Sequence, residues 1–316
     1  MSSTVRLPTA IPHGRTARRL EWPFLPPDLR AAIERRCGSP VVDAHTQRSG
    51  FTPGFASVLV CEDGSRHFVK AASVKAQRMF AEAYRVEARK LAALPEGVPA
   101  PRLLWTLEED WVVLGIEHVA SRQPARPWTV PDLDACLDSL ETVAAALTPV
   151  PEALALDGFA DELAGFPAYW ERLHTLPGGL ARVEEAAALA ARFGEVTAGQ
   201  TVVHSDLRDD NVLLDPDGRA WFCDWNFPVA GADWIDSLLM LIGPRGDGLD
   251  VEEVIRRRPL LRDVPAESVD IVLALVTGYF LASAQDPVPP TSPHIRDHQR
   301  WQGEVCWAWL GERRGW

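Results

Sequence analysis

The chain has 316 residues, enough for one large domain or two lobes, and its 47% apolar and 24% charged residues indicate an ordinary globular protein. Its 44 acidic residues outnumber its 32 basic ones and give a net charge of −12. This balance argues against nucleic acid as the main partner, because binding a phosphate backbone needs a basic face, and it permits attraction of cationic small molecules.

The cysteines and the apolar segments indicate the cellular location of the protein. No pair of cysteines has the spacing of a metal or redox motif, so reduced thiols are expected. Residues 1–20 contain no apolar run typical of a signal peptide. The most apolar stretch, residues 271–284, falls short of the roughly 20 residues that span a bilayer and predicts a buried core helix. We therefore expect a cytoplasmic protein with no membrane partner, and the oligomeric state is left open. The five cysteines are Cys37, Cys61, Cys136, Cys223 and Cys306.

The first part of the chain reads as an arm followed by a small lobe rich in strands. Residues 1–27 are rich in Pro and Arg and predict an irregular arm. Glu62-Asp63-Gly64 has turn chemistry between two apolar runs, which is typical of a hairpin. The predicted elements are a helix over 28–38, a strand over 41–47, a hairpin over 55–71, a helix over 73–94 and strands over 102–107 and 111–119.

After about residue 120 the sequence pattern becomes mainly helical. A segment of different character, residues 201–226, interrupts the helices. The layout predicts an α+β protein with a small β-rich lobe over 1–119, including the arm, and a larger, mainly helical lobe over 120–316. The predicted helices cover 131–147, 161–174, 180–196, 233–242, 266–284 and 294–312.

The segment TVVHSDLRDDNVLLDPDGRAWFCDWN, residues 201–226, holds six aspartates beside a His-x-Asp. TVVH predicts a strand that ends at His204, and NVLLD and RAWFCDW predict two strands around the turn at Pro216-Asp217-Gly218. Carboxylates crowded beside buried strands repel one another and resist desolvation, so a positive charge must offset them. The oxygens of Asn211 and Asp224 could share a hard cation such as Mg²⁺, which would leave Asp206 free to accept a proton from a hydroxyl.

These spacings resemble the kinase superfamily. His204-x-Asp206-x₄-Asn211 is similar to its catalytic loop, and Asp224 follows Asn211 by 13 residues, where the second metal ligand is expected. The match HSDLRDDN…FCDWN, with Asp-Trp in place of Asp-Phe-Gly, resembles the aminoglycoside phosphotransferase and choline kinase branch. The resemblance covers roughly residues 45–240. It implies a bilobal protein-kinase-like fold and transfer of a phosphate from ATP, with GTP left open, in the presence of Mg²⁺.

The family uses a strand lysine for the α- and β-phosphates and a helix glutamate that holds the lysine. Lys70 ends the apolar strand HFVK. On the following helix, Glu87 falls on an apolar stripe that includes Tyr84 and Leu91 at helical spacing. A carboxylate there is costly to leave unpaired, so we expect it to pair with Lys70. Glu82 lies off the stripe and is the weaker alternative.

The resemblance also assigns nucleotide contacts to two further segments. The loop SGFTPGF, residues 49–55, would be the phosphate lid, and Thr52 would offer its hydroxyl and backbone to the phosphates. The strand over 112–119 would receive adenine through backbone hydrogen bonds near Glu117 and Val119.

Two residues of the loop depart from the usual family pattern, which has Gly after the histidine and often a small or neutral residue two positions after the Asp. Ser205 and Arg208 occupy these places. Arg208 either neutralises charge on the transferred phosphate or forms a plain salt bridge with Asp209 or Asp210. His204 is expected to brace the loop rather than transfer protons.

The acceptor is expected to be a small molecule that carries a hydroxyl. A protein kinase needs a long activation segment and an Ala-Pro-Glu motif, and neither follows Asp224. Acceptors in the family include antibiotics, amino sugars, choline, homoserine and sugars, and a non-catalytic nucleotide-binding scaffold is the alternative from another class. Carboxylates in the helical lobe, among them Asp209, Asp210 and Glu304, favour a cationic acceptor if they face the cleft.

Overall fold

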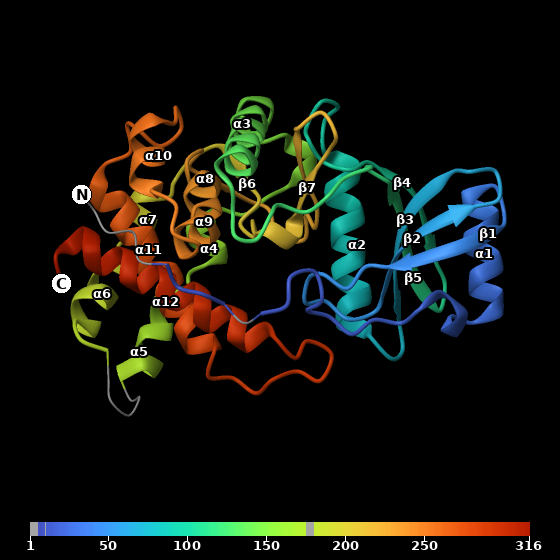
Figure 1. The fold of residues 1–316 in the computed structure, drawn as a ribbon, viewed down its shortest axis with the longest axis horizontal. Helices are drawn as coiled ribbons and strands as arrows, with labels where there is room; N and C mark the ends of the chain where they lie inside the picture. Colours follow the sequence, from blue (N-terminus) through green and yellow to red (C-terminus); the bar gives the residue numbers. More distant parts are fainter. Residues whose placement is uncertain (1–5, 10, 175–179) are drawn as a thin grey trace.

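The computed structural model describes residues 6–9, 11–174 and 180–316, and it separates a sheet-bearing N-terminal lobe from a helical C-terminal lobe (Figure 1). The predicted α+β class is therefore confirmed. Residues 1–5 and 10 of the predicted arm lie outside the described residues. The strand-rich part ends with a strand at Glu117 and the first long helix of the second part begins at Val130, and the predicted boundary at 119/120 falls between them.

The N-terminal lobe is built on a five-stranded antiparallel sheet of order β1-β2-β3-β5-β4. Its central strand β3 carries Lys70, which lies opposite Ala56 of β2 and Leu114 of β5. The sheet confirms the strands predicted from the apolar runs. The strands are β1 (Val41–Thr46), β2 (Phe55–Cys61), β3 (Arg66–Ser73), β4 (Leu103–Glu108) and β5 (Trp111–Glu117).

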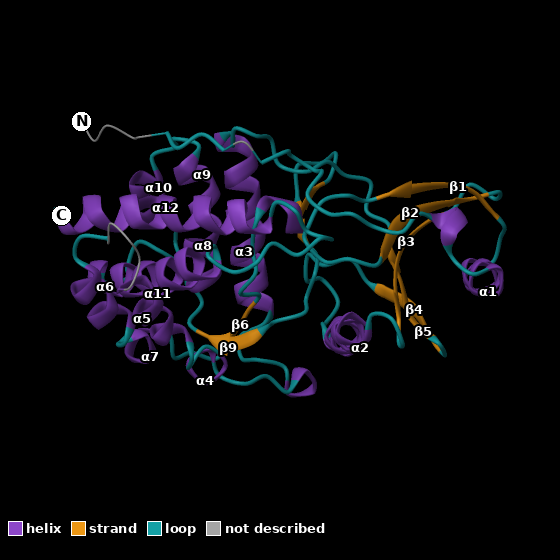
Figure 2. Cartoon of the chain, turned by 90° about the horizontal axis from the view of Figure 1, so that it is seen from below, coloured by secondary structure: helices purple, strands orange, loops and turns teal. Residues whose placement is uncertain are grey.

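Two helices, α1 (Pro27–Cys37) and α2 (Arg78–Ala93), cover the two faces of this sheet, which lies between them in Figure 2. Alternation along β5 explains this arrangement, because successive side chains of a strand point to opposite faces. Leu114 packs in the same core cluster as residues of α2, and Val113 packs in the cluster that contains residues of α1.

Helix α2 begins at Arg78, five residues later than predicted. Ser73 is still part of β3, and the chain then turns tightly. The Ser73 hydroxyl accepts a hydrogen bond from the backbone N–H of Ala76 at 3.2 Å, and its carbonyl accepts one from Gln77 at 2.8 Å. A serine side chain that competes for backbone hydrogen bonds favours such a turn over a helix.

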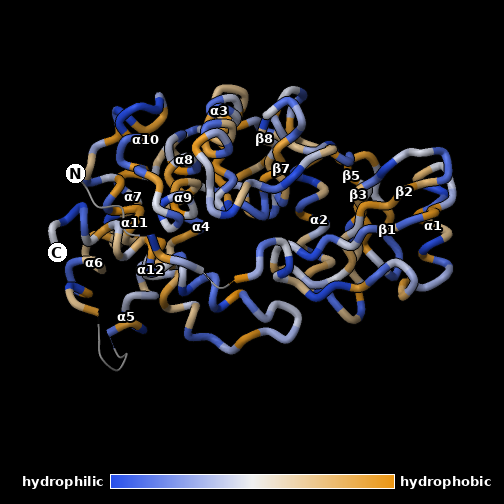
Figure 3. The backbone as a smooth tube through the Cα atoms, in the orientation of Figure 1, coloured by the Kyte–Doolittle hydropathy of each residue, from blue (hydrophilic) through white to orange (hydrophobic). Residues whose placement is uncertain are grey.

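The C-terminal lobe packs its helices around α11, which meets the length and hydropathy of a membrane-spanning helix but has 72% of its 18 residues buried inside the protein. This burial is typical of a core helix, as predicted. Hydrophobic residues gather along the inner helices and strands, and the outer loops are more hydrophilic (Figure 3). The helices are α3 (Val130–Ala146), α4 (Phe159–Glu162), α5 (Tyr169–His174), α6 (Val183–Ala190), α7 (Phe193–Val196), α8 (Ile235–Met240), α9 (Ile242–Gly246), α10 (Val251–Arg257), α11 (Ala266–Ser283) and α12 (Ile295–Arg314), with short 3₁₀ turns η1 (Trp22–Phe24), η2 (Glu152–Leu154), η3 (Phe166–Ala168) and η4 (Asp209–Asn211).

Two of the predicted helices are broken into shorter pieces. The helix predicted over 161–174 is divided into α4, η3 and α5, because Gly165 and Pro167 interrupt the helical backbone. The helix predicted over 180–196 is divided into α6 and α7. The one predicted over 233–242 is found as the shorter helix α8, and α9 begins at the last predicted residue. Helix α10 was not predicted.

Two short antiparallel strand pairs carry the aspartate-rich segment. Strand β6 (Thr201–Val203) pairs with β9 (Val229–Gly231), and β7 (Val212–Leu214) pairs with β8 (Ala220–Phe222). The second pair is the hairpin predicted around Pro216-Asp217-Gly218, with strands shorter than the apolar runs. It brings the loop that follows β6 next to the residues that follow β8.

Candidate active site

The loop between β6 and β7 is fixed by a buried carboxylate of α8. Asp236 accepts hydrogen bonds from the backbone N–H groups of His204 at 2.6 Å and Ser205 at 3.0 Å. Nε2 of His204 lies 3.0 Å from the carbonyl oxygen of Cys223, and Nδ1 lies 3.3 Å from the backbone nitrogen of Asp206. Burial lowers the pKa of His204 and so favours the neutral ring. With the Cys223 carbonyl as acceptor and the Asp206 N–H as donor, the neutral imidazole braces the loop.

Ser205 has a φ of 65°, in the left-handed region that favours glycine. This explains why the loops that the sequence resembles carry Gly at the same place. The Ser205 hydroxyl donates a hydrogen bond to the carbonyl oxygen of Phe227 at 2.7 Å, which offsets part of the cost of this backbone conformation.

The carboxylate of Asp206 lies at the centre of the loop. Its Oδ1 accepts a hydrogen bond from Nη1 of Arg208, and its Oδ2 lies 3.3 Å from Nδ2 of Asn211, which also donates to the Asp206 carbonyl at 2.8 Å. Burial raises the pKa of Asp206 to about 6, although the Arg208 charge opposes the rise. The group is therefore mostly ionised at neutral pH, with a pKa close to that of an effective general base.

Arg208 is held between two carboxylates rather than one. Besides Asp206, it pairs with Asp210 through an Nε–Oδ1 contact of 2.7 Å, and its guanidinium lies over the ring of Phe51 at 5.5 Å. The Asp209 carboxylate is not paired with it but forms a bidentate pair with Arg126, with distances of 2.7 and 2.8 Å. Of the two predicted salt bridges, the one with Asp210 is therefore found and the one with Asp209 is not.

Lys70 joins the helix glutamate to the segment that follows β8. Its Nζ donates to Oε1 of Glu87 at 2.6 Å and to Oδ1 of Asp224 at 2.8 Å. Although burial opposes the charged amine, the carboxylates of Asp224 and Glu87 raise the pKa of Lys70. Glu87 is 1% exposed, whereas Glu82 is exposed and pairs with Arg85. The Lys70–Glu87 pair is therefore present, and the alternative partner Glu82 is wrong.

The residues predicted to hold Mg²⁺ offer a suitable set of oxygens. Burial opposes ionisation of Asp224, but the adjacent Lys70 lowers its pKa to about 2, so a carboxylate is available. The Asn211 amide nitrogen is used by Asp206, which leaves its oxygen for another partner. Nδ2 of Asn226 donates to Asp224, and Oδ1 of Asn226 is buried with no hydrogen-bond donor among the described residues. An unpaired buried oxygen beside a carboxylate fits a hard cation.

A cavity of about 780 Å³ opens between the lobes and lies next to these groups. It brings the lid residue Thr52 and the predicted adenine contacts Glu117 and Val119 into one space with the lysine and the metal ligands. Asp210 lines this cavity, whereas Asp206, Arg208, Asp209 and Glu304 do not. The predicted nucleotide and metal residues that line it are Thr52, Lys70, Glu87, Glu117, Val119, Asn211 and Asp224.

The acidic residues predicted to face the acceptor are placed less favourably. Asp209 is buried in its pair with Arg126, and Asp210 is neutralised by Arg208. Glu304 lies on an exposed position of α12. The negative electrostatic potential around the loop is therefore weaker than the sequence indicates, because arginines offset two of the carboxylates.

Sequence reasoning missed the basic residues that line the cavity from outside the motifs. Arg19 comes from the N-terminal arm and Arg48 from the loop after β1, and both line the cavity. The signal for Arg19 was the Arg-rich composition of the arm, which does not say where the arm lies, and Arg48 belongs to no motif.

The comparisons with solved structures agree with this arrangement. An aminoglycoside phosphotransferase from Alicyclobacillus acidocaldarius has a TM-score of 0.58 and 16% identity, and covers 92% of this chain and 96% of its own. For a spectinomycin phosphotransferase in complex with ADP and spectinomycin, the TM-score is 0.61 at 10% identity, with 90% and 98% covered. For a choline kinase from Streptococcus pneumoniae, the TM-score is 0.54 at 12% identity, with 89% and 99% covered. Identities this low show a shared protein-kinase-like fold.

The sequence itself supplies the family. A search of curated proteins finds no match. The family model described as "Phosphotransferase enzyme family" matches residues 57–258, which is more than half of the chain and contains the lysine, the helix glutamate and the catalytic loop. The chain therefore belongs to the phosphotransferase enzyme family and is similar in fold to aminoglycoside phosphotransferases and choline kinases.

Proposed function

We propose that this phosphotransferase moves the γ-phosphate of ATP to a hydroxyl of an antibiotic-like or amino-sugar-like small molecule. The observation that carries the proposal is the convergence of two clusters in one place. Lys70, Glu87 and Asp224 form one chain of ion pairs, and Asp206 and Asn211 are hydrogen-bonded to each other beside it. These are the groups that phosphoryl transfer needs to position phosphates and to accept a proton.

The catalytic step assigned to Asp206 is proton abstraction from the acceptor. As the acceptor oxygen forms a bond to the γ-phosphorus, the bond from that phosphorus to the bridging oxygen breaks and ADP leaves. The hydroxyl proton passes to the carboxylate of Asp206, whose raised pKa of about 6 suits this exchange at neutral pH. Arg208, which contacts the same carboxylate, supplies positive charge close to the transferred phosphate.

Lys70 steadies the α- and β-phosphates in this proposal, and Glu87 keeps the lysine in place. Asn211 and Asp224 would hold Mg²⁺, which neutralises charge on the phosphates when bound. Glu117 and Val119 would receive adenine at the end of β5, and Thr52 would contact the phosphates from the lid. GTP remains open as an alternative donor.

The acceptor would bind against aromatic side chains of the C-terminal lobe. Burial, followed by the charge of the Asp206 carboxylate, raises the pKa of Tyr279 in α11. Its ring stacks on Phe166 with centroids 4.6 Å apart, and Phe227 is 61% exposed next to Ser205. Aromatic faces beside a carboxylate favour a cationic molecule, through cation–π contacts and charge attraction.

The remaining assignments follow from composition and burial. All five cysteines are free, and the one helix of the described residues that could span a membrane is mostly buried, which supports a cytoplasmic location. The partner is a small molecule rather than nucleic acid, in keeping with the net charge of −12.

An ATP-consumption screen over antibiotics, amino sugars and small amino alcohols tests the proposal, with Asp206→Asn as the matched inactive control. The proposal requires an acceptor whose mass increases by one phosphate with the wild-type protein only. A phosphorylated choline, homoserine or plain sugar instead would keep the kinase chemistry and replace the acceptor class. Nucleotide binding without turnover across the whole screen would favour the scaffold alternative.

A further inference from the structure

The N-terminal arm runs from the helical lobe to the sheet (Figure 1), and some of its residues line the cavity between the lobes. At one end, the backbone N–H of Leu7 donates to Gly246 of α9 at 2.9 Å, and Nε1 of Trp301 in α12 donates to the Leu7 carbonyl at 2.8 Å. At the other end, the N–H of Leu20 donates to the carbonyl of Gly54 at 3.0 Å. The arm is therefore fixed to both lobes by backbone hydrogen bonds.

Between these ends, the arm holds the predicted phosphate lid. The Arg48 carbonyl accepts hydrogen bonds from the N–H groups of Thr16 at 2.8 Å and Ala17 at 2.9 Å, and the Thr16 hydroxyl donates to the Gly50 carbonyl at 2.7 Å. On the opposite side, the hydroxyl of Ser292 donates to the carbonyl of Phe51. The lid is thus held between the arm and the C-terminal lobe.

Arg19 is one of three arm residues, with Gly14 and Arg15, that line the cavity together with Lys70 and Asp224. Its Nη2 donates to the carbonyl of Ser49 at 2.8 Å, while its Nε is buried without a hydrogen-bond acceptor. The described residues give it no carboxylate within salt-bridge distance, unlike Lys70, which is shared by two carboxylates. A half-buried arginine whose buried Nε has no acceptor, and which forms no ion pair among the described residues, is suited to bind an anion.

The lid is shaped to admit this guanidinium. Gly50 has a φ of 80°, and a side-chain carbon at that position would lie 3.1 Å from Nη2 of Arg19. Glycine therefore satisfies both the left-handed backbone and the close approach of the arginine.

We propose that Arg19 binds the phosphate groups of the nucleotide, so that the N-terminal arm is part of the nucleotide site. This inference rests on the proposed function, since it assumes that the cavity takes a nucleoside triphosphate. The planar guanidinium offers two parallel N–H groups to phosphate oxygens, and Arg19 forms no ion pair with Glu87 or Asp224, the carboxylates that hold Lys70.

Binding of a non-hydrolysable ATP analogue and of adenosine, each measured by calorimetry with the full chain, tests this role. Arg19→Ala is expected to weaken the analogue about tenfold or more and to leave adenosine unchanged, because only the analogue carries phosphates. Arg19→Lys should recover part of the loss. Arg18→Ala, which removes an exposed side chain of the same arm, is the matched control and should bind both ligands as the wild type does.

The outcomes separate this inference from the function on which it rests. A wild-type protein that binds neither ligand would overturn the proposed function itself. If the wild type binds the analogue and Arg19→Ala binds it equally well, the phosphate role is wrong. Equal weakening of adenosine and the analogue in Arg19→Ala would show that the residue only shapes the lid, and it would also reject the inference.

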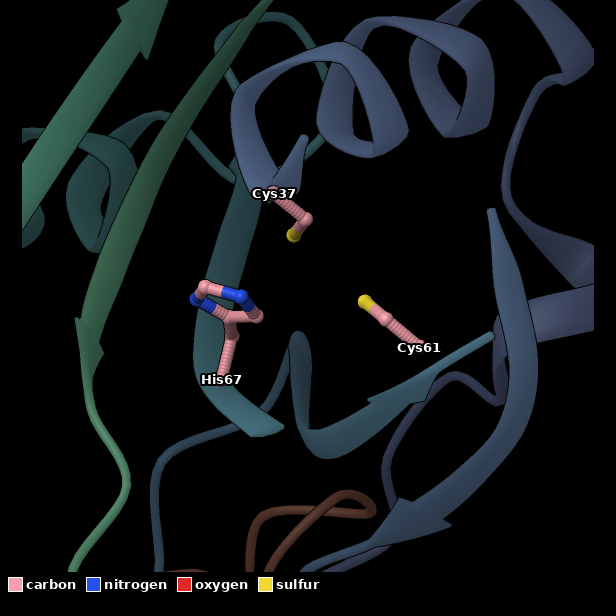
Figure 4. Close-up of side chains that lie close together, drawn as sticks. All are labelled: Cys37, Cys61 and His67. Carbon is pink, nitrogen blue, oxygen red and sulfur yellow. The ribbon is translucent and has the colours of Figure 1, made fainter. Parts of the chain in front are cut away.

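A second cluster carries an independent inference at the far side of the N-terminal lobe. Cys37 ends α1, Cys61 ends β2 and His67 lies in β3, and Figure 4 shows both thiols pointing into the space beside the imidazole ring. One ligand atom of each residue lies within 4.8 Å of the other two. Cys37 and Cys61 lack the spacing of a metal motif in the sequence, as the sequence analysis found, and only the fold brings them together with His67.

The donor set suits a metal ion that prefers sulfur and imidazole. A tetrahedral Zn²⁺ with bonds of about 2.3 Å to sulfur separates two thiolates by about 3.8 Å, so the groups need to move by about 1 Å or less. The Nδ1 atom of His67 is buried with no hydrogen-bond partner, and Nε2 lies 3.3 Å from the Ser65 hydroxyl. We infer that Cys37, Cys61 and His67 form a three-ligand zinc site that ties α1 to the sheet, with water in the fourth position.

Titration of the reduced, metal-free full chain with Co²⁺, followed by its thiolate charge-transfer absorption, tests the zinc site. We expect one Co²⁺ per chain, displaced by Zn²⁺, and loss of the absorption band in Cys37→Ser and Cys61→Ser. His67→Asn should weaken binding by tenfold or more, and Cys306→Ala, in the other lobe, should bind as the wild type. An absent band, an unchanged band in the cysteine variants, or a mass that shows a Cys37–Cys61 disulfide in the purified protein would each reject the site.

Discussion

Lys70 and Asp224 are separated by 154 positions in the sequence, and their charged atoms lie 2.8 Å apart. The lysine belongs to the sheet of the N-terminal lobe and the aspartate follows β8 of the C-terminal lobe, so one ion pair joins the two lobes at the candidate active site. Because Glu87 contacts the same amine at 2.6 Å, the lysine is positioned by one carboxylate from each lobe.

We predict that Glu87→Ala destabilises the protein by about 3–5 kcal/mol, because it leaves the buried amine of Lys70 with only one carboxylate. Denaturant unfolding measures this change. Glu82→Ala removes an exposed partner of Arg85 on the same helix and should change the free energy of unfolding by about 0.5 kcal/mol or less. If the two substitutions lowered the free energy of unfolding equally, Glu87 would not be the buried partner that stabilises Lys70.

Asp206→Asn is predicted to lower the turnover rate by about 10²–10⁴ while leaving nucleotide affinity nearly unchanged. The amide cannot accept the hydroxyl proton, and Asp206 does not line the nucleotide cavity. Steady-state kinetics with the best acceptor and calorimetry with ADP measure the two quantities. Near-wild-type turnover would remove Asp206 from the role of base.

Both Asn211→Ala and Asp224→Ala are predicted to raise the Mg²⁺ concentration needed for half-maximal activity. The effect of Asp224→Ala should be larger, because this residue carries the formal charge and also positions Lys70. Activity titrated against Mg²⁺ gives the comparison. If neither substitution shifts the metal dependence, the assignment of these two ligands fails.

The stability of the protein is predicted to fall as the pH drops through the range in which buried His298 resists protonation. Burial, followed by the charge of Arg208, lowers the pKa of His298 from 6.5 to about 4, although Asp210 and Asp209 oppose the change and Arg126 adds to it. Above pH 6.5 the His298 ring is neutral in both the folded and the unfolded protein, so it causes no loss in the free energy of unfolding. Between pH 6.5 and 4 the unfolded chain binds the proton first, so up to about 3 kcal/mol of stability is lost.

The free energy of unfolding of His298→Gln, measured by denaturant titration at several pH values, checks this prediction. The variant should lose less stability than the wild type between pH 7 and pH 4, because glutamine does not titrate. His45→Gln, which replaces an exposed histidine of the N-terminal lobe, should follow the wild-type curve. Parallel curves for the wild type and His298→Gln would contradict the assignment.

A cationic acceptor should bind less well at high salt. We predict that KM for the best acceptor rises several-fold between about 0.05 and 0.5 M salt, because screening weakens its attraction to the Asp206 carboxylate and to a protein with a net charge of −12. The KM for ATP in the same titration provides the reference. An acceptor KM that is indifferent to salt, or a neutral best acceptor, would remove the cationic class and leave the phosphotransferase assignment intact.

Local sequence patterns were enough for the elements and residues that depend on short spacings. The position of Glu87 in an apolar stripe follows from helical periodicity, so its burial and its pairing with Lys70 could be predicted. The hairpin β7–β8 follows from two apolar runs around a turn, and it places Asp224 beside the loop that carries Asp206. In each case a short local segment, a stretch of helix or a hairpin, fixes where the side chains lie.

The contacts that could not be predicted join distant segments. Asp209 meets Arg126 across 83 positions, and no short-range rule indicates this partner or the loss of a free carboxylate that follows from it. The path of the arm to the cavity depends on hydrogen bonds with both lobes, which leave no periodic signal. The helix predicted over 161–174 failed for another reason, since Gly165 and Pro167 break it at a point where the apolar pattern continues.

The double attachment of the arm makes it a tether between the lobes. A hinge motion that widens the cleft must either break the hydrogen bonds of Leu7 with Gly246 and Trp301 or pull the lid away with Thr16. If the cavity takes the nucleotide as proposed, we expect release of ADP to depend on undocking of the arm, a segment that lies outside the residues matched by the family model.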